Sequence, residues 1–366
     1  MRVVVQAILA SFLIATSVAA GQMPSSIGTL RVEKIAGNLP EPWALAFLPD
    51  GGFLVTLRDG EMRHYRANGE FVTLSGVPKP HVQGQGGLLD VVVLRDFEAS
   101  REIAFTYSYR NRLLRRQGTA VAVARLSADG TELENIRTVF QMQPGSRGPV
   151  HYGSRIVEAP DGRLFVTLGD RGIAEWAQMP DSHNGSVIAI NRDGTPAGAG
   201  FAGLPEIWSI GHRNPQGAAL DPKGRLFVVE HGAQGGDEVN LIRPGVNYGW
   251  PVISYGKNYD NSKIGTGTHK QGLEQPKWYW DPSIAPSGMA IYDGDLFPAW
   301  RGDFFVGSLK YDMISRLRWQ GGTLVEVERL SAPETGRIRD IRQAPDGSLW
   351  FLSVYEEAVF RIVPDR

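Results

Sequence analysis

The sequence predicts an all-β protein, a six-bladed β-propeller built from four-stranded antiparallel blades. A turn of the type Pro-Asp-Gly followed by an apolar strand recurs along the chain, and its six units are spaced by about 40 to 80 residues. Each four-stranded blade needs about this much chain. Long amphipathic helical patterns are missing between the units, which disfavours a βαβ fold. The spacing alone is compatible with five to eight blades, and we predict six.

The recurring turn carries a physical reason for its sequence. Proline sets the first turn torsion and glycine supplies a positive φ, so each copy predicts a hairpin. Two degenerate copies are expected at 95–97 and 301–303. Four clear copies lie at 49–51, 160–162, 222–224 and 345–347.

The two ends of the chain have different expected roles. Residues 1–20 form a secretory signal peptide by pattern, with Arg2, an apolar run over 3–18 and a small-residue cleavage site at 18–20. A membrane anchor is the alternative, but this run is short for a spanning helix. We expect a periplasmic or secreted protein whose residues 21–366 form one propeller domain. The strand pattern at 359–363 is expected to close the ring against an N-terminal strand such as 30–34.

Composition limits the function classes. The formal net charge is −1, so no broad positive face is available for nucleic-acid binding. The chain has no cysteine, which excludes disulfides, thiolate metal sites and a cysteine nucleophile. No histidine pair has the i, i+4 spacing of a zinc helix, and no Gly-x-Ser-x-Gly elbow occurs, so hydrolase chemistry has little support.

The most informative segment is 206–251, which places many glycines, carboxylates and amides at expected strand ends. It contains EIWSIGHRNPQG at 206–217, EHGAQGGDE at 230–238 and NYGWP at 247–251. Together with GQGGLLD at 84–90 and GPVHYGSR at 148–155, it resembles the soluble pyrroloquinoline quinone (PQQ)-dependent aldose dehydrogenases, which are six-bladed propellers. The resemblance covers nearly all of residues 21–366.

The resemblance implies a catalytic histidine. His151 corresponds to the base that takes the proton of the sugar's anomeric hydroxyl, and an imidazole suits that task because it titrates near neutral pH. Without the resemblance, a histidine at this position is more often a packing residue. Gln85 is implied as a contact to the substrate or the quinone. Its neighbours Gly86 and Gly87 are expected to let a planar ligand approach the backbone.

The resemblance also implies a set of residues that bind PQQ. Arg213 corresponds to a donor to the reactive carbonyl region of the quinone, assisted by Asn214. Lys310, Arg337 and Arg339 complete a cationic set, and strand alternation predicts that the two arginines share one face. PQQ carries three carboxylates, for which lysine and paired arginines are apt partners.

Calcium is the second implied cofactor. The main-chain carbonyls of Gly232 and Ala233 correspond to ligands of the catalytic Ca²⁺, and carbonyl oxygens suit this hard cation. A second, structural ion is expected at Glu238 and the carbonyl of Tyr248. The alternative for Glu238 is a salt bridge or a turn cap.

These expectations define one function and its rivals. We expect oxidation of an aldose at C1 to the lactone, with hydride transfer to PQQ and electrons passed to an external acceptor, by a monomer or weak dimer. Val150 stands where some relatives have a polar residue. Ala233 replaces a proline common in the glucose-specific branch, whose long insertions are also absent, and this favours broad aldose specificity. The alternatives are a non-redox propeller that binds a sugar or a protein, and a calcium-dependent propeller lactonase, which would lack the Arg/Lys set.

Overall fold

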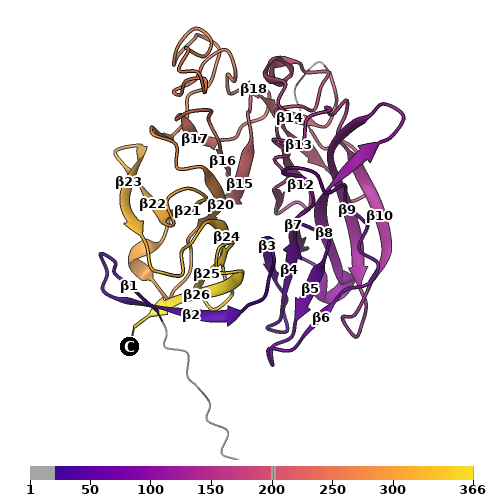
Figure 1. Ribbon diagram of the computed structural model, residues 1–366, viewed down its shortest axis with the longest axis vertical. Helices are drawn as coiled ribbons and strands as arrows, with labels where there is room; N and C mark the ends of the chain where they lie inside the picture. The colour runs from indigo at the N-terminus through magenta and orange to yellow at the C-terminus, as the bar shows by residue number, and fades with distance from the viewer. Residues whose placement is uncertain (1–20, 199–200, 202, 366) are drawn as a thin grey trace, which may run out of the picture.

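Six β-sheets form the protein and surround a central axis (Figure 1). The computed structural model describes residues 21–198, 201 and 203–365, so the expected signal peptide at 1–20 lies outside the described residues. The first strand of each sheet contacts the first strands of its two neighbours, which gives an inner ring. The predicted six-bladed propeller is therefore confirmed.

In the first three sheets along the chain the innermost strand comes first and the next three strands follow it as antiparallel neighbours. The first contains β3 (Pro42–Phe47), β4 (Phe53–Leu57), β5 (Met62–Tyr65) and β6 (Phe71–Thr73). The second contains β7 (Leu88–Val93), β8 (Glu102–Asn111), β9 (Arg116–Leu126) and β10 (Leu133–Gln141). The third contains β11 (Ile156–Glu158), β12 (Leu164–Leu168), β13 (Ser186–Ile190), β14 (Ile207–Ile210) and β18 (Val246–Asn247).

The remaining sheets follow the same order from the axis outward. The fourth contains β15 (Pro215–Leu220), β16 (Leu226–Glu230), β17 (Asp237–Leu241) and β19 (Trp278–Trp280). The fifth contains β20 (Pro286–Ile291), β21 (Phe304–Ser308), β22 (Ile314–Gln320) and β23 (Thr323–Leu330). The sixth contains β24 (Ile338–Gln343), β25 (Leu349–Ser353), β26 (Ala358–Pro364), β2 (Leu30–Ala36) and β1 (Gly21–Met23).

Two sheets differ from the predicted four strands because each has a fifth strand on its outer edge. Strand β18 pairs in parallel with β14, and β1 pairs antiparallel with β2. Both additions cover backbone groups that an edge strand would otherwise leave unpaired. The third sheet is therefore not purely antiparallel.

The recurring turns lie where the sequence predicts them. Each joins the first strand of a sheet to the second, and the degenerate copies occur beside the short helices α1 (Phe97–Ser100) and η2 (Pro298–Trp300). A third short helix, η1 (Ala174–Gln178), follows β12. In the four clear copies the glycine has a φ of 74° to 86°, at Gly51, Gly162, Gly224 and Gly347.

The ring closes as predicted, because β2 from the N-terminal end pairs with β26 from the C-terminal end. Arg31 lies opposite Val363, and Lys34 lies opposite Phe360. Neighbouring sheets pack face to face through buried apolar side chains, as where Phe227 meets Phe304 edge-on at 4.9 Å between ring centroids. Burial of this kind is the main favourable term in folding.

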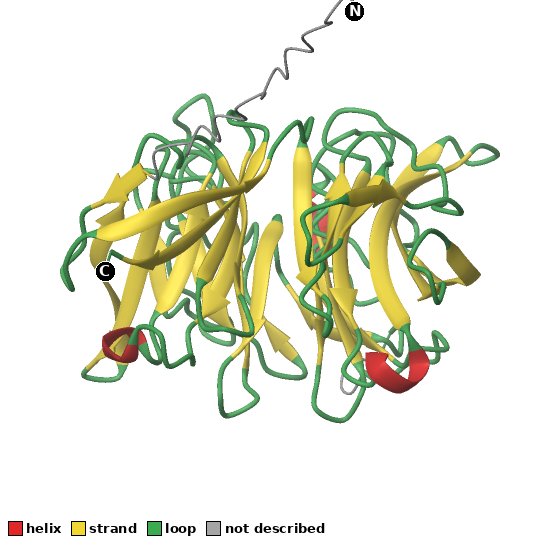
Figure 2. Ribbon diagram, turned by 90° about the horizontal axis from the view of Figure 1, so that it is seen from below, coloured by secondary structure: helices red, strands yellow, loops and turns green. Residues whose placement is uncertain are grey.

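Seen from the side, the strands run between two faces covered by loops (Figure 2). The N-terminal ends of the six inner strands all lie at the same one of these faces. Along each sheet the chain runs outward through antiparallel strands and then comes back to this face, where the next inner strand begins. No helix in the described ranges is long and apolar enough to cross a bilayer.

Candidate functional site

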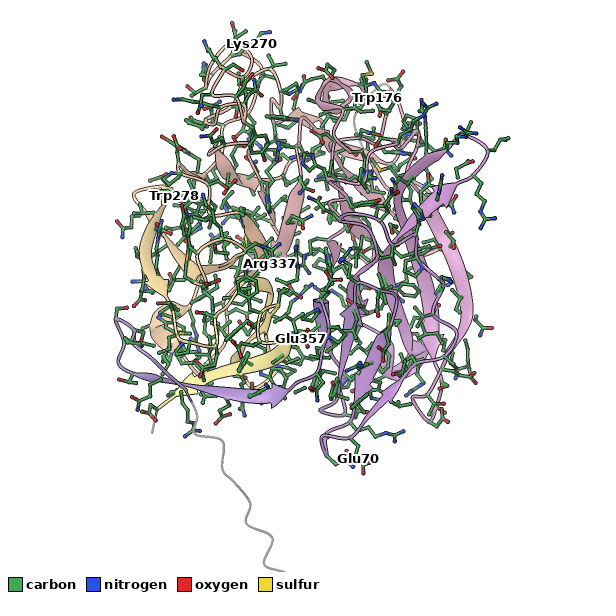
Figure 3. All side chains as sticks on the ribbon, viewed as in Figure 1. Glu70, Trp176, Lys270, Trp278, Arg337 and Glu357 are labelled. Atoms are coloured by element: carbon green, nitrogen blue, oxygen red, sulfur yellow. The ribbon has the colours of Figure 1, made fainter. Side chains whose placement is uncertain are left out.

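A cavity of about 310 Å³ lies at the N-terminal ends of the inner strands. All six sheets or the loops that enter them contribute to its wall. Four of the residues predicted for the site line it, namely Gln85, Asn214, Arg337 and Arg339. The wall also includes Trp43, Arg58, Tyr152, Gln216 and His231. The label of Arg337 in Figure 3 marks this region, where the innermost strands converge.

Arg339 is a half-buried cation of the cavity wall. Its Nη1 donates to Oε1 of Gln216 at 2.8 Å, and its guanidinium lies 5.7 Å from the ring centroid of Trp43. Burial and the neighbouring charges of Arg155 and Arg337 lower the pKa of Arg339 to about 9. Among the described residues, no carboxylate forms an ion pair with it. A partly desolvated cation without a carboxylate partner favours an anionic ligand.

Arg337 reaches the same wall for a reason other than strand alternation. It lies immediately before β24, in a turn, with a φ of 46°. Its N–H donates to Oδ1 of Asp312 at 2.8 Å, and its Nη1 donates to the carbonyl of Leu309 at 2.9 Å. The alternation argument is therefore wrong for Arg337, although the two arginines do line one cavity.

His151 is held by a carboxylate. Its Nδ1 lies 2.6 Å from Oδ1 of Asp170, which follows β12. Oδ1 of Asp170 also accepts the N–H of Gly172 at 2.8 Å, and Oδ2 accepts Nε1–H of Trp250 at 2.9 Å. Because both oxygens of Asp170 accept hydrogen bonds, Nδ1 of His151 is the donor of this pair and Nε2 is left as an acceptor. The imidazole is 16% exposed and its partner is 2% exposed, so the base is reachable and its anchor is not.

Gln85 connects this histidine to the cavity wall. Its Oε1 accepts the main-chain N–H of His151 at 2.7 Å. On either side of Gln85, the carbonyls of Gly84 and Gly86 accept Nη1–H of Arg58 at 2.6 and 3.2 Å. The loop is thus fixed to both the first and the third sheets.

The glycines next to Gln85 have a different role from the one expected. A Cβ on Gly87 would collide with the carbonyl of Arg58, and a Cβ on Gly86 would lie 2.7 Å from the hydroxyl of Tyr152. The close approach that requires glycine is therefore to other parts of the protein. The approach of a planar ligand is not needed to explain why Gly86 and Gly87 are glycines.

Arg213 is buried and lies beside the hydrogen-bonded pair of His151 and Asp170. Its Nη1 donates to the carbonyl of Gly232 at 2.5 Å, and its guanidinium lies 5.3 Å from the ring centroid of Trp250. Because Trp250 also donates to Asp170, Arg213 is connected to the partner of His151 through one indole ring. Arg213, Gly232 and the candidate base thus form one cluster.

Lys310 takes a more exposed position. Its Nζ donates to the carbonyl of Ser283 at 3.2 Å and lies 4.9 Å from the ring centroid of Tyr311. The preceding residue, Leu309, lines the cavity, whereas Lys310 itself is not part of the wall. The structure therefore places five of the six predicted cationic and amide ligands in or beside the cavity and Lys310 at its outside.

The predicted calcium ligands fall into two places. The carbonyl of Gly232 points to Arg213, and its N–H donates to Oδ1 of Asp237 at 2.8 Å. Ala233 follows in the same loop. Across the described part of the chain, no group of three or more His, Cys, Asp or Glu side chains could hold a metal ion. A cation here would thus depend on carbonyls and on a ligand brought by the cofactor.

Glu238 lies in a buried polar cluster below this loop. Nδ2 of Asn240 donates to Oε2 of Glu238 at 3.1 Å and to Oε1 of Glu230 at 3.0 Å. Burial and the charge of Glu230 raise the pKa of Glu238 to about 8. Oδ1 of Asn240 is buried without a partner among the described residues. Unsatisfied oxygens and a carboxylate with a raised pKa fit a cation, and Tyr248 is buried nearby against His212.

Comparison with known proteins decides the family. The sequence model of the glucose/sorbosone dehydrogenase family matches residues 39–361. The chain belongs to this family. It is 42% identical over 335 residues to aldose sugar dehydrogenase YliI of Escherichia coli K12, which covers 89% of this chain and 90% of that protein.

Solved structures of this glucose/sorbosone dehydrogenase family agree with the fold. The apo-form of the soluble aldose sugar dehydrogenase from Escherichia coli has a TM-score of 0.86 at 39% identity, covering 92% of this chain and 100% of that one. The PQQ-bound form of aldose sugar dehydrogenase from Streptomyces coelicolor has a TM-score of 0.75 at 27% identity, covering 94% and 98%. The resemblance found in the sequence is confirmed, and the chain is an aldose sugar dehydrogenase homologue.

Sequence reasoning missed several groups in and beside this family member's cavity. Asp170 was open to detection, because a Gly-Asp pair directly after a strand indicates a polar group at a strand end. Trp43, Gln216 and Trp250 gave no comparable signal. They come from three separate parts of the chain and meet only in the folded ring.

Proposed function

We propose that this protein oxidises aldose sugars at C1 to the lactone, using PQQ and Ca²⁺, and passes the electrons to an external acceptor. The observation that carries the proposal is the pair Arg337 and Arg339 on the cavity wall, where Arg339 has no carboxylate partner among the described residues and its pKa is lowered to about 9. Such a site needs a multiply charged anion. The PQQ-bound form of a Streptomyces coelicolor relative supports PQQ as that anion.

The residues present fit both cofactors. Arg337, Arg339 and Asn214 would hold PQQ, which when bound supplies a two-electron acceptor for the hydride from C1. The carbonyls of Gly232 and Ala233 would hold Ca²⁺, which supplies a Lewis acid. Carbonyl oxygens are ligands that this ion accepts readily.

A second ion would be bound by Glu238 and the carbonyl of Tyr248. The raised pKa of Glu238 and the unpartnered Oδ1 of Asn240 both indicate a place where a positive charge is missing. This ion has a structural role in the proposal, because the cluster lies on β17 and not on the cavity wall.

His151 is the proposed base. Its Nε2 takes the proton of the C1 hydroxyl as the hydride leaves C1, so the sugar loses two electrons and two hydrogens. Asp170 keeps the hydrogen on Nδ1 and stabilises the imidazolium that forms. A fixed carboxylate partner orients the ring before the sugar binds, which lowers the entropy cost of reaching the reactive arrangement.

Two further groups have proposed electrostatic and positioning roles. Arg213 stabilises negative charge that develops beside the base, and its buried stack on Trp250 fixes the guanidinium. Gln85 has the role of orienting the sugar, because it lines the cavity and its Oε1 is hydrogen-bonded to the backbone N–H of the proposed base His151. Lys310 would contact the ligand only from outside the wall.

We also propose that residues 1–20 direct export and are then removed, which gives a periplasmic or secreted enzyme. The basis is Arg2, the apolar run at 3–18 and the small residues at 18–20. In this proposal the enzyme accepts a broad range of small aldoses.

The test is reconstitution of the purified apo-protein. PQQ should bind saturably when Ca²⁺ is present, and an aldose should then bleach the quinone absorption and reduce an artificial dye. The trimethyl ester of PQQ is a matched ligand control, because it keeps the ring system and lacks the charges that Arg337 and Arg339 are proposed to meet. No PQQ binding, or lactone hydrolysis without dye reduction, would contradict the proposal and favour a binding module or a lactonase.

A further inference from the structure

The hairpin that joins β8 to β9 extends beyond its neighbours at the edge of the molecule (Figure 1). Its tip carries two apolar side chains in succession, Leu113 and Leu114, which are 92% and 56% exposed. Exposed leucines are ordinary when they are scattered singly, but two at a projecting tip form an apolar contact element. Val82 in the adjacent loop adds a third exposed apolar side chain, at 47%.

Arginines flank this tip on both strands. Arg110 and Arg112 precede the leucines, Arg115 and Arg116 follow them, and no Asp or Glu occurs between Glu102 and Asp129. Most of these arginines are exposed, and within the described part of the chain none of the four is in an ion pair. The whole chain has a net charge of −1, so this concentration of positive charge is local.

Two hollows beside the hairpin are lined by the same cations. One, of about 290 Å³, is lined by Arg110, Arg115 and Arg147 with two glutamines. The other, of about 510 Å³, includes Lys79, His81, Arg110 and Arg112 in its wall. Recesses of this composition suit phosphate groups, because guanidinium groups donate in pairs to phosphate oxygens.

We propose that this hairpin docks the protein on an anionic lipid bilayer. Leu113 and Leu114 enter the boundary between headgroups and acyl chains, while the flanking arginines and the two hollows bind lipid phosphates. This combination of an apolar tip with adjacent cations is what interfacial membrane binding requires. An acidic protein partner is less well matched, because the leucines project from the surface and do not line a recess.

Docking in this way has an orientation. Strand β8 pairs antiparallel with β7, and Tyr107 near the hairpin lies opposite Leu88 at the start of β7. The hairpin therefore leaves from the same end of the sheet as the cavity, whose wall includes Gln85 and Leu89. A docked molecule turns its cavity-bearing face toward the bilayer. The proposal does not depend on the identity of the cofactor.

The test is flotation of the protein with vesicles, followed by quantification of the bound fraction. We expect binding to vesicles of phosphatidylcholine with about one third phosphatidylglycerol, and little binding to phosphatidylcholine alone. Replacing Arg112→Ala and Arg115→Ala together should weaken the partition by about 30-fold, since each cation near the surface contributes about one factor of five. Leu113→Ala with Leu114→Ala should weaken it by about a hundredfold or more, because two isopropyl groups no longer enter the bilayer.

A matched control removes the same charge elsewhere. Lys34 and Lys223 are exposed and lie away from the hairpin, on β2 and in the turn after β15. Lys34→Ala with Lys223→Ala should leave the partition unchanged, and all three double variants should keep the wild-type melting temperature. Equal partition of the hairpin variants and the lysine control would overturn the proposal. So would failure of the wild-type protein to float with anionic vesicles at about 0.05 M salt, which would leave the hairpin to an acidic protein.

Discussion

Replacing Arg339 with alanine separates a cofactor site from a structural ion pair. Arg339 donates to Gln216, lies against Trp43 and is not in an ion pair with any described carboxylate. A charge-assisted hydrogen bond to a carboxylate contributes about 1.5–3 kcal/mol. Arg339→Ala should therefore weaken PQQ binding by roughly ten- to a hundredfold, at about 1.4 kcal/mol per decade.

The stability of the apo-protein should not fall in this variant. Burial and the neighbouring cations Arg155 and Arg337 lower the pKa of Arg339, which means that its charge is costly when no anion is bound. Loss of that charge should leave the melting temperature of the apo-protein unchanged or slightly higher. The assays are titration with PQQ in the presence of Ca²⁺ and thermal unfolding of the apo forms.

Arg342 on the same strand is the matched control. Its Nη2 donates to Asp90 at 2.7 Å and its Nε donates to Asp340 at 3.0 Å. Arg342→Ala leaves two buried carboxylates short of a partner, which should cost about 3–5 kcal/mol of stability. If Arg339→Ala instead destabilises the apo-protein as Arg342→Ala does, and PQQ affinity stays the same, the interpretation of the cavity wall is wrong.

Three further outcomes are expected. His151→Ala should lower kcat by roughly 10²–10⁴ while PQQ still binds, and near wild-type turnover would remove His151 from the mechanism. Asp170→Asn should also lower kcat with PQQ affinity retained, because the amide no longer fixes the hydrogen on Nδ1; a normal pH profile and rate in this variant would show that the pair is only structural. Chelation with EDTA should abolish activity, and Ca²⁺ should restore it better than Mg²⁺ because a site of carbonyl ligands is large and flexible; full activity with no metal by elemental analysis would exclude the proposed role of calcium.

The parts of the fold that the sequence predicts are those with local causes. A Pro-Asp-Gly turn has the same physical basis wherever it occurs, so the first hairpin of each blade could be placed without a structure. Pairing of β2 with β26 was predictable because two unmatched strand patterns stood at the ends of the chain. The fifth strand β18 was not, since two residues carry no periodicity.

The candidate site also combines features that short motifs predict with features that depend on the folded ring. Gln85 and His151 were found through short motifs, but their direct link depends on a loop of one sheet meeting a loop of the next. Arg337 was placed correctly for the wrong reason, because its position comes from a turn with positive φ and not from strand alternation. The Trp43 ring beneath Arg339 lies almost 300 residues away in sequence, and only closure of the ring brings it there.

The seam between β2 and β26 determines when the cavity wall is complete. The sheet that carries Arg339, with Arg337 directly before its first strand, is completed only when β2 pairs with β26. The cavity wall, which includes Arg337 and Arg339, is therefore complete only when this seam is closed. A ligand that bridges this sheet to its neighbours in turn opposes opening of the seam, and its stabilisation grows with its free concentration. Supply of the cofactor would then govern how long the closed ring survives.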